Sequence, residues 1–256
     1  MSSTPVLLLL GAGSNLGSSI ATTFSKAGYR VALVARSHEP GLQKNGYFHI
    51  RADLGDAGCM PGIFEEVTKN MGIPTVVVYN AVQYKLDDEK DPFATLGPET
   101  VSRFHSAMAV NGTTPVIAMH HAIEAFRKLP SDTAKGRSFI FTGNILNRAA
   151  TPNRLCFGCA KTVCAYGIKM ASVMYASEGM RFYYADERTS EGLPVMRDID
   201  GTVAGKVYLD LAEAPEQRPW NYTYLKDGKY QDFEDGREYI TVREASTAEF
   251  RKGGRD

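Results

Sequence analysis

The chain has 256 residues, with 29 Lys and Arg against 29 Asp and Glu, so its formal net charge is zero, and 43% of its residues are hydrophobic. This length fits one large domain or at most two small ones, and it allows an ample hydrophobic core. Charge neutrality argues against a nucleic-acid binder, which is expected to carry a basic excess. Four cysteines are too few in a chain of this size for a disulfide framework.

No segment of the sequence is predicted to cross a membrane. The apolar run Val6–Leu10 has five residues and no basic residue before it, so it is too short for a signal peptide or a span. No later run reaches the ~18 apolar residues that a span needs. We therefore expect a soluble, cytoplasmic protein in a reducing compartment, with no membrane partner and no nucleic-acid partner.

Short apolar runs alternate with longer mixed stretches over the first 185 residues. The predicted buried strands are Val6–Leu10, Val31–Ala35, Tyr47–Ala52, Val76–Tyr79, Ser138–Thr142 and Met180–Ala185. The predicted helices between them are Ser18–Ala27, Pro61–Met71, Glu99–Val110, Pro115–Lys128 and Cys159–Glu178. Strands separated by helices indicate right-handed crossovers, so we expect an α/β fold with a Rossmann-like, doubly wound parallel sheet covered by helices on both faces.

The last part of the chain has a different composition, rich in charges and aromatic residues. A helix is predicted at Val203–Ala212, and Tyr239–Val242 is a candidate last edge strand. The chain is then one domain with three parts: a cofactor-binding core (1–185), a region expected to cover the substrate (186–250) and a frayed tail (251–256).

A glycine-rich loop follows the first strand directly and precedes a helix. It reads Gly11-Ala-Gly13-Ser-Asn-Leu-Gly17. Glycine lets the backbone turn tightly and approach a pyrophosphate, whose charge suits a helix N-terminus. The alternative is an ordinary glycine turn between a strand and a helix. The candidate contacts to a dinucleotide in this loop are Gly11, Gly13, Ser14, Asn15, Leu16 and Gly17.

This loop resembles that of the short-chain dehydrogenase/reductase family, in which glycines stand at positions one, five and seven. Gly11 and Gly17 fit the first and last of these, and Asn15 stands where the middle glycine is expected. The resemblance covers about residues 5–185 and implies a nicotinamide dinucleotide as the cofactor.

Two motifs after later strands extend the resemblance. Asp53-Leu54 is similar to the family's acidic–apolar pair, which holds the adenine amino group and ring. Asn80-Ala81 is similar to the centre of the family's Asn-Asn-Ala-Gly motif, although Tyr79 and Val82 add bulk at its two ends. These four matching residues are therefore further candidate cofactor contacts.

The residues after the second strand point to the phosphorylated cofactor. NAD-specific enzymes usually place a carboxylate there for the ribose hydroxyls, and this chain has Arg36-Ser37 instead. The Arg36 guanidinium can donate bidentate hydrogen bonds to a 2′-phosphate, and Ser37 can donate a further hydrogen bond. We therefore predict NADP(H), with a solvated surface arginine as the alternative interpretation of Arg36.

The resemblance implies a catalytic set of Asn, Ser, Tyr and Lys, of which this chain matches two. Asn111 matches the asparagine that holds a water through a backbone kink, and Lys161 matches the lysine. Phe157 stands four residues before Lys161, where the family has its proton-donating tyrosine, and Asn144 stands thirteen residues earlier, where it has its serine. Thr142 supplies a hydroxyl if the loop register differs. An atypical member without the catalytic Ser and Tyr is therefore expected.

Other residues carry weaker predictions. Thr189 follows the sixth strand, where the family's Pro-Gly is absent, and is a candidate contact to the nicotinamide amide. Cys156 and Cys159 flank Phe157 and suggest either a reactive thiol or small buried residues. Tyr84 is not placed by the sequence. No metal site is predicted, because no second ligand pair has metal spacing.

Three functions remain open. The first is an NADP(H)-dependent reductase whose substrate needs no tyrosine acid, such as an enone or an iminium. The second is a non-redox cyclase, isomerase or dehydratase that keeps NADP as a scaffold, and the third is an inactive binding or regulatory protein. The aromatic residues after position 186 suggest a small hydrophobic substrate. The resemblance further implies a homodimer or homotetramer through the helices around 102–128 and 159–178.

Overall fold

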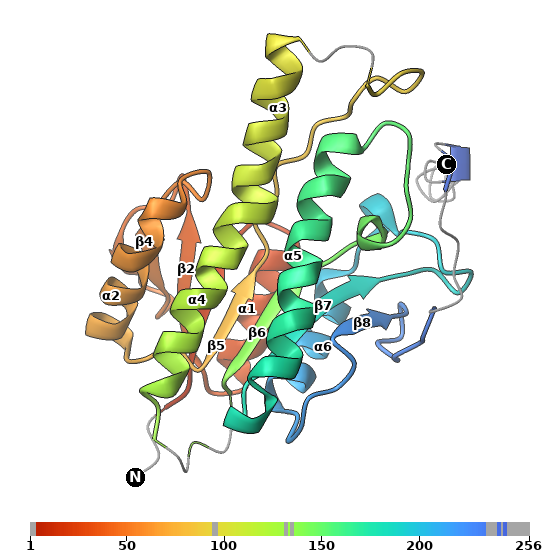
Figure 1. Ribbon diagram of the computed structural model, residues 1–256. Coiled ribbons are helices and arrows are strands. Elements are labelled where there is room, and N and C mark those ends of the chain that lie inside the picture. Colours follow the sequence, from red (N-terminus) through yellow and green to blue (C-terminus); the bar gives the residue numbers. More distant parts are fainter. Residues whose placement is uncertain are drawn as a thin grey trace, which may run out of the picture.

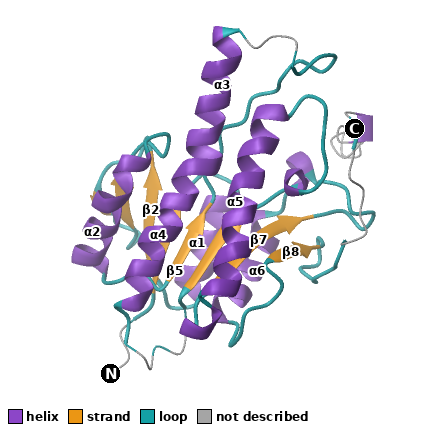
Figure 2. Cartoon of the chain, in the orientation of Figure 1, coloured by secondary structure: helices purple, strands orange, loops and turns teal. Residues whose placement is uncertain are grey.

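The computed structural model describes residues 4–93, 97–130, 133, 136–233, 240–241 and 243–244. Within these ranges eight strands form one sheet in the order β3-β4-β2-β1-β5-β6-β7-β8 (Figures 1 and 2). All neighbouring pairs are parallel except β3 with β4, which are antiparallel at one edge. The strands are β1 (Val6–Leu10), β2 (Arg30–Ala35), β3 (Gly41–Leu42), β4 (Phe48–Arg51), β5 (Val76–Tyr79), β6 (Ser138–Thr142), β7 (Arg181–Glu187) and β8 (Asn221–Tyr224).

Helices cover both faces of the sheet, as the alternation of elements predicts. One face packs against α1 (Leu16–Lys26) and α6 (Gly201–Glu213), and the other against α2 (Met60–Met71), α4 (Thr114–Arg127) and α5 (Leu155–Met174). The central strands β1 and β5 are buried along their whole length. The predicted doubly wound α/β fold is therefore confirmed.

A long rod of helix runs beside α5 and extends past the sheet (Figure 1). Its first part is α3 (Pro98–Met108), which passes through a π-helical segment, Ala109–Thr113, directly into α4. The sequence predicts two helices here, and the structure joins them through this wider turn. Short 3₁₀ turns lie at Ala57–Cys59, Ile145–Asn147, Ala176–Glu178 and Met196–Asp198.

The last strand of the sheet differs from the prediction. The sequence places an edge strand at Tyr239–Val242, but Ile240 and Thr241 lie outside any strand, while Tyr239 and Val242 fall outside the described residues. The strand is instead β8, which pairs parallel to β7. Its polar alternation, Asn-Tyr-Thr-Tyr, hides it from a search for continuous apolar runs. The predicted tail at 251–256 lies outside the described residues.

Close helix packing holds α6 against α1. A Cβ added at Gly205 would lie 2.6 Å from Thr23 Oγ1, and one at Gly201 would lie 2.7 Å from Ser19 Oγ. A side chain at either position would force these neighbours to shift, so the glycines allow the two helices to pack this closely. The crossing brings the start of α6 beside the glycine-rich loop.

Part of the C-terminal region returns to the carboxyl end of the sheet. Ile240 is buried, and its amide donates to the carbonyl of Ala150 at 3.0 Å. Its side chain joins a small apolar cluster with Leu146, Ala149 and Phe157. Covering of a substrate by residues 186–250 stays a prediction. In the described part of the chain no helix combines the length and apolar character that crossing a bilayer requires.

Candidate active site

The glycine-rich loop connects the buried strand β1 to α1. Gly11 has a φ of +96°, and a Cβ on it would lie 2.3 Å from the backbone nitrogen of Ala81. A Cβ on Gly17 would lie 2.8 Å from the backbone of Ala12, whereas one on Gly13 would have no atom within 4 Å. The fold itself thus requires glycine at positions 11 and 17. At position 13 the absence of a side chain leaves the outer side of the loop open, as close approach of a pyrophosphate needs.

Asn15 stands where the family has its middle glycine, and it links distant parts of the chain. Its Nδ2 donates to the carbonyl of Ile199 at 3.3 Å, just before α6. The neighbouring carbonyl of Ser14 accepts a hydrogen bond from Ser18 Oγ at 2.6 Å. Asn15 therefore ties the loop to the segment that precedes α6.

A cavity of about 370 Å³ lies along the carboxyl ends of β1, β2, β4 and β5. The structure brings many of the predicted cofactor contacts together around it: Gly11, Gly13, Arg36, Ser37, Asp53, Leu54, Asn80 and Ala81. Ser14, Asn15, Leu16 and Gly17 are not among its lining residues. Exposed Arg36 and Ser37 stand at one end of the cavity, and Gln83 and Val110 at the other. An open glycine loop with a cationic donor beyond it suits a phosphorylated dinucleotide.

Thr189 lies elsewhere. It lines a separate cavity of about 540 Å³ together with Leu193, Val195 and Leu225. Its Oγ1 accepts a hydrogen bond from the amide of Leu193 at 3.1 Å, within a turn. Its contact with a nicotinamide amide stays a prediction.

Asn111 lies in the π-helical segment, which is the backbone kink that the resemblance implies. Its Nδ2 donates to the carbonyls of Gln83 at 2.9 Å and Ala107 at 3.0 Å, and its Oδ1 accepts from the amide of Gln83 at 3.2 Å. Both amide hydrogens are therefore used by the backbone. In this structure the buried Asn111 side chain fixes the start of the loop between β5 and α3.

A chain of hydrogen bonds ties the ends of three central strands. Tyr208 on α6 donates to Thr142 Oγ1 at 3.1 Å, and Thr142 Oγ1 donates to Asn80 Oδ1 at 2.9 Å. Asn80 Nδ2 in turn donates to the carbonyl of Gly11 at 2.9 Å. The hydroxyl of Thr142 is thus committed to holding Asn80 and has no proton left for a substrate. The sequence did not single out Tyr208.

Lys161 is buried on α5 and reaches the end of β6. Its Nζ donates to the carbonyl of Thr142 at 2.9 Å and lies 4.2 Å from the centre of the Phe141 ring and 5.4 Å from that of Phe157. Burial lowers the pKa of Lys161 to about 8, against the attraction of nearby Cys164 and Asp186. The ring faces and the carbonyl stabilise the ammonium that remains.

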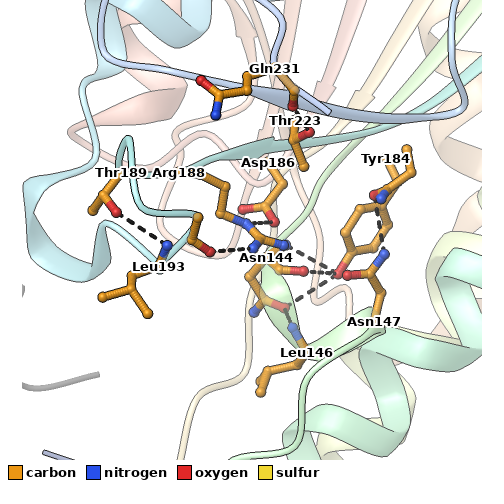
Figure 3. Close-up of polar contacts among 12 residues, drawn as sticks. Asn144, Leu146, Asn147, Tyr184, Asp186, Arg188, Thr189, Leu193, Thr223 and Gln231 are labelled. Atoms are coloured by element: carbon orange, nitrogen blue, oxygen red, sulfur yellow. Dashed lines mark hydrogen bonds and ion pairs between the residues drawn. The ribbon is translucent and has the colours of Figure 1, made fainter. Parts of the chain in front are cut away.

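Asn144 is held by Tyr184, a residue of β7 (Figure 3). The Tyr184 hydroxyl accepts from the amide of Asn144 at 3.1 Å and donates to its carbonyl at 2.9 Å. A Cβ added at Gly143 would lie 2.3 Å from the Tyr184 ring, so glycine is required there. Asn144 Oδ1 accepts from the amide of Leu146 at 3.1 Å. This bond fixes the orientation of the side-chain amide, with Nδ2 as its remaining donor.

Asn144 and Phe157 meet at a small cavity, as the family spacing predicts. The cavity has a volume of about 60 Å³ and is also lined by Tyr84 and Arg154. Phe157 further lines a cavity of about 680 Å³, where Gln83 contributes as well. Because Gln83 also lines the dinucleotide cavity, the two larger spaces adjoin. No sequence motif marks Tyr84 or Arg154 as a site residue. Tyr84 reaches the cavity from the long loop between β5 and α3, and Arg154 reaches it from the turn before α5.

An ion pair of Asp186 and Arg188 is buried behind Asn144 (Figure 3). Burial raises the pKa of the Asp186 carboxyl, opposed by the charges of Arg188 and Lys161. A neutralised pair of this kind organises the loop after β7 and offers no free acid to the cavity.

The surroundings of Cys156, which lies beside Phe157, indicate that this cysteine packs in the interior and is not a reactive thiol. Burial and the neighbouring Asp87 raise the pKa of Cys156 to about 11, so its thiol stays protonated at neutral pH. Asp87 accepts the amide of Cys156 at 2.9 Å, near the start of α5. All four cysteines of the chain are free thiols. Within the described ranges no cluster of three or more His, Cys, Asp or Glu has the arrangement of a metal site.

Comparison with known proteins identifies the family. Residues 5–191 match the family model described as short chain dehydrogenase. The chain belongs to the short-chain dehydrogenase/reductase family. The short chain dehydrogenase/reductase dmxR12 of Cryptosporiopsis sp. (strain 8999) is 33% identical to this family member over 242 residues, which are 90% of this chain and 96% of that relative.

Solved structures of this family share the fold. A 3-oxoacyl-(acyl-carrier protein) reductase from Brucella melitensis superposes with a TM-score of 0.70 at 16% identity, over 88% of this chain and 96% of that one. The angucycline C-6 ketoreductase LanV with bound NADP superposes with a TM-score of 0.65 at 20% identity, over 84% and 90%. At these identities the similarity shows the fold of a dehydrogenase/reductase and not a shared substrate.

Substitutions of the first two glycines of the loop, Gly11 and Gly13, are expected to have opposite effects. Gly11→Ala forces a Cβ against the backbone of Ala81 at a positive φ, and we expect it to destabilise the fold by about 1–3 kcal/mol. Gly13→Ala meets open space, so stability should stay within about 0.5 kcal/mol while dinucleotide affinity falls. Thermal unfolding and titration with the dinucleotide measure both. Unchanged affinity in Gly13→Ala would contradict the assignment of the loop.

Lys161 predicts a pH dependence of stability. The pKa of Lys161 is about 8 in the folded protein against an ordinary 10.5. Below pH 8 the buried side chain is charged, which lowers the free energy of unfolding. Between pH 8 and 10.5 the unfolded chain holds a proton that the folded chain has lost, and rising pH then favours folding.

The free energy of unfolding of the wild type, relative to Lys161→Met, should therefore increase as pH rises from 8 to 10. Denaturant unfolding of both proteins at each pH isolates this group, because other titrations cancel in the difference. A difference that stays flat or decreases with pH would show that the ammonium is not buried.

Proposed function

We propose that this chain is an NADP(H)-dependent oxidoreductase that reduces a small, apolar, conjugated carbonyl compound without the family's tyrosine acid. The observation that carries the proposal is the position of α5. It directs the buried Lys161 to the carbonyl of Thr142 at the end of β6, and the ring of Phe157 lines the cavity where the family spacing leads us to expect a phenol. A contact of Lys161 with the cofactor ribose, which the resemblance implies, is part of this proposal.

The choice of NADP(H) rests on Arg36 and Ser37. Both are exposed and line the adenosine end of the cavity, and the guanidinium can donate two hydrogen bonds to a 2′-phosphate. LanV carries bound NADP, which agrees with this assignment, whereas another matching structure, a 3-oxoacyl-(acyl-carrier protein) reductase from Brucella melitensis, is in complex with NAD. The cofactor is therefore argued from these two residues and not from the fold.

The donor at Asn144 favours a carbonyl over an iminium. Its Oδ1 is occupied by the backbone, so the Nδ2 hydrogens are the part of the side chain that can bind a substrate oxygen. A bound dihydronicotinamide supplies a hydride to carbon. In a conjugated carbonyl compound the resulting charge spreads onto the oxygen as an enolate, which an amide donor stabilises. An iminium nitrogen has no lone pair for this donor.

The larger cavity beside Phe157 suits a compound with an apolar body. Ala107, Cys156 and Phe157 line one part of its 680 Å³, and Lys85 and Arg103 provide charge at another. A bicyclic or larger ring system fits a space of this volume. We propose a small hydrophobic substrate that enters there and presents its carbonyl to Asn144.

Substitution of Arg36 tests the cofactor. Arg36→Asp should weaken NADPH binding by about 10- to 100-fold, because it replaces a charge-assisted donor with a repelling carboxylate. NADH binding should change little. Lys26→Asp makes the same change of charge at the exposed C-terminal end of α1 and is the matched control. Fluorescence titration with both nucleotides gives the affinities; equal losses for NADH and NADPH would count against a 2′-phosphate contact.

Turnover tests the reaction. With bicyclic enones, NADPH absorbance should fall while a saturated ketone forms in equal amount. Conversion of the compound without loss of NADPH would select the non-redox alternative. Tight NADPH binding without any conversion would support the binding-protein alternative.

We also propose that the protein forms a homodimer through α5. Large apolar side chains project from one side of this helix into solvent: Val163, Tyr166, Met170, Val173 and Met174. Val173 is 73% exposed, so most of this apolar side chain contacts solvent in the single chain. Exposed apolar rows of this kind mark interfaces, and a second copy offers the same row in a symmetric arrangement.

Charged substitutions on this row test the dimer. Met170→Glu combined with Val173→Glu should yield a folded monomer by light scattering, while the wild type has twice that mass. Lys69→Glu on α2 is a control for surface charge. A monomeric wild type would refute the proposal.

A further inference from the structure

The loop between β5 and α3 brings a second aromatic residue to the ring of Phe157. The Tyr84 and Phe157 ring centres lie 5.3 Å apart, with an interplanar angle of 81°. Both side chains line the small cavity of about 60 Å³ that Asn144 also lines. A phenol therefore stands beside the position that the family's tyrosine would occupy, although it comes from a different element, 73 residues earlier in the chain.

A buried cation is directed at this phenol. Arg154 Nη2 donates to the Tyr84 hydroxyl oxygen at 3.2 Å, and the guanidinium carbon lies 5.9 Å from the centre of the Tyr84 ring. Arg154 is only 9% exposed, and its Nη1 is held by Asn153 Oδ1 at 2.9 Å. Because the guanidinium can only donate, the hydrogen of the Tyr84 hydroxyl is not used in this bond and can go to another acceptor.

The same cavity then holds two donors from separate parts of the fold. Asn144 Nδ2 comes from the loop after β6, where Tyr184 and the amide of Leu146 hold its backbone and its Oδ1. Tyr84 comes from the loop between β5 and α3 and lines the same cavity, with its hydroxyl oxygen held by Arg154. Two donors at one cavity are a usual means of stabilising an oxygen that becomes negative.

We propose that Tyr84 is the proton donor of this enzyme and that it replaces the tyrosine missing at position 157. This inference rests on the proposed function, in which a carbonyl oxygen is held at Asn144. The hydride of the proposed reaction supplies the two electrons. As negative charge reaches the substrate oxygen, a lone pair on that oxygen forms a bond to the Tyr84 hydroxyl hydrogen.

The bond between Tyr84 Oη and this hydrogen breaks, and its electron pair stays on the phenolate oxygen. The adjacent Arg154 cation stabilises the phenolate through a charge-assisted hydrogen bond. Tyr84 is 46% exposed, so water can return a proton to it and restore the phenol. The neutral enol formed on the substrate then tautomerises to the saturated ketone: its α-carbon takes a proton from water, and its oxygen gives one back to water. Tyr84 thus contributes the proton and Arg154 acts as a positioning residue.

Infrared spectroscopy of a bound enone tests the proposal apart from turnover. A bicyclic enone labelled with ¹³C at its carbonyl is bound to the protein with NADP⁺, which cannot transfer hydride. Its carbonyl stretch should lie lower in the wild type than in Tyr84→Phe, since the phenol polarises the carbonyl. Tyr47→Phe, at the amino end of β4 on the other side of the sheet, should leave the stretch unchanged.

Kinetics and a relocated hydroxyl complete the test. Tyr84→Phe should lower kcat for enone reduction by about 100-fold with little change in KM, as for loss of a general acid. The double variant Tyr84→Phe with Phe157→Tyr moves the phenol to α5 and should regain the lowered stretch and much of the rate.

The outcomes distinguish failure of the proposed role of Tyr84 from failure of the proposed enone reduction. An unchanged stretch and rate in Tyr84→Phe, in a wild type that reduces the enone, would overturn the role of Tyr84 and leave the proposed function standing. A wild type that neither binds nor reduces any bicyclic enone would overturn both.

Discussion

The hydrogen bond from the buried Lys161 ammonium to the carbonyl of Thr142 fixes α5 against the end of β6. Burying this cation is unfavourable, as its lowered pKa shows, and the fold tolerates it because a carbonyl and two aromatic faces surround it. The bond sets the rotation and height of the helix relative to the sheet. It therefore decides that position 157 faces the cavity and that the dinucleotide cavity and the larger cavity meet beside it.

Around this contact the ends of the strands are joined by side chains. The links from Tyr208 through Thr142 and Asn80 to Gly11 cross β6, β5 and β1, and they use up the Thr142 hydroxyl, which a different loop register would have offered to a substrate. Tyr184 supports Asn144 in the same way, and Gly143 makes room for its ring. The hydroxyl groups of Thr142, Tyr184 and Tyr208 thus serve the scaffold, and in our proposal the amide of Asn144 and the phenol of Tyr84 bind the substrate.

The fold followed from the sequence because its signals are local. Continuous apolar runs such as Val6–Leu10 define buried strands, and the glycines at 11 and 17 satisfy contacts within a few residues or with the adjacent strand. The cofactor cavity was largely predictable for the same reason, since contacts such as Arg36 and Asp53 follow directly after strands. Strand β8 was missed because its alternation is polar.

The substrate side was not predictable to the same extent. Tyr84 reaches Phe157 only through the path of a long loop, and Arg154 reaches Tyr84 from the turn before α5, so neither has a spacing that signals its role. Thr142 has the right residue type for catalysis, but tertiary hydrogen bonds give it a structural role. Residue type and register locate a site, whereas the direction of each donor depends on contacts between distant segments.

We propose that the protein holds a phosphorylated nicotinamide dinucleotide and presents a carbonyl substrate to donors other than the side chain at position 157. A crystal structure of the ternary complex with NADP⁺ and a bicyclic enone tests it most directly. We expect the 2′-phosphate at Arg36 and the enone oxygen within hydrogen-bonding distance of both Asn144 Nδ2 and Tyr84 Oη. An enone oxygen directed away from both groups, or a cavity filled by side chains with no nucleotide, would contradict it.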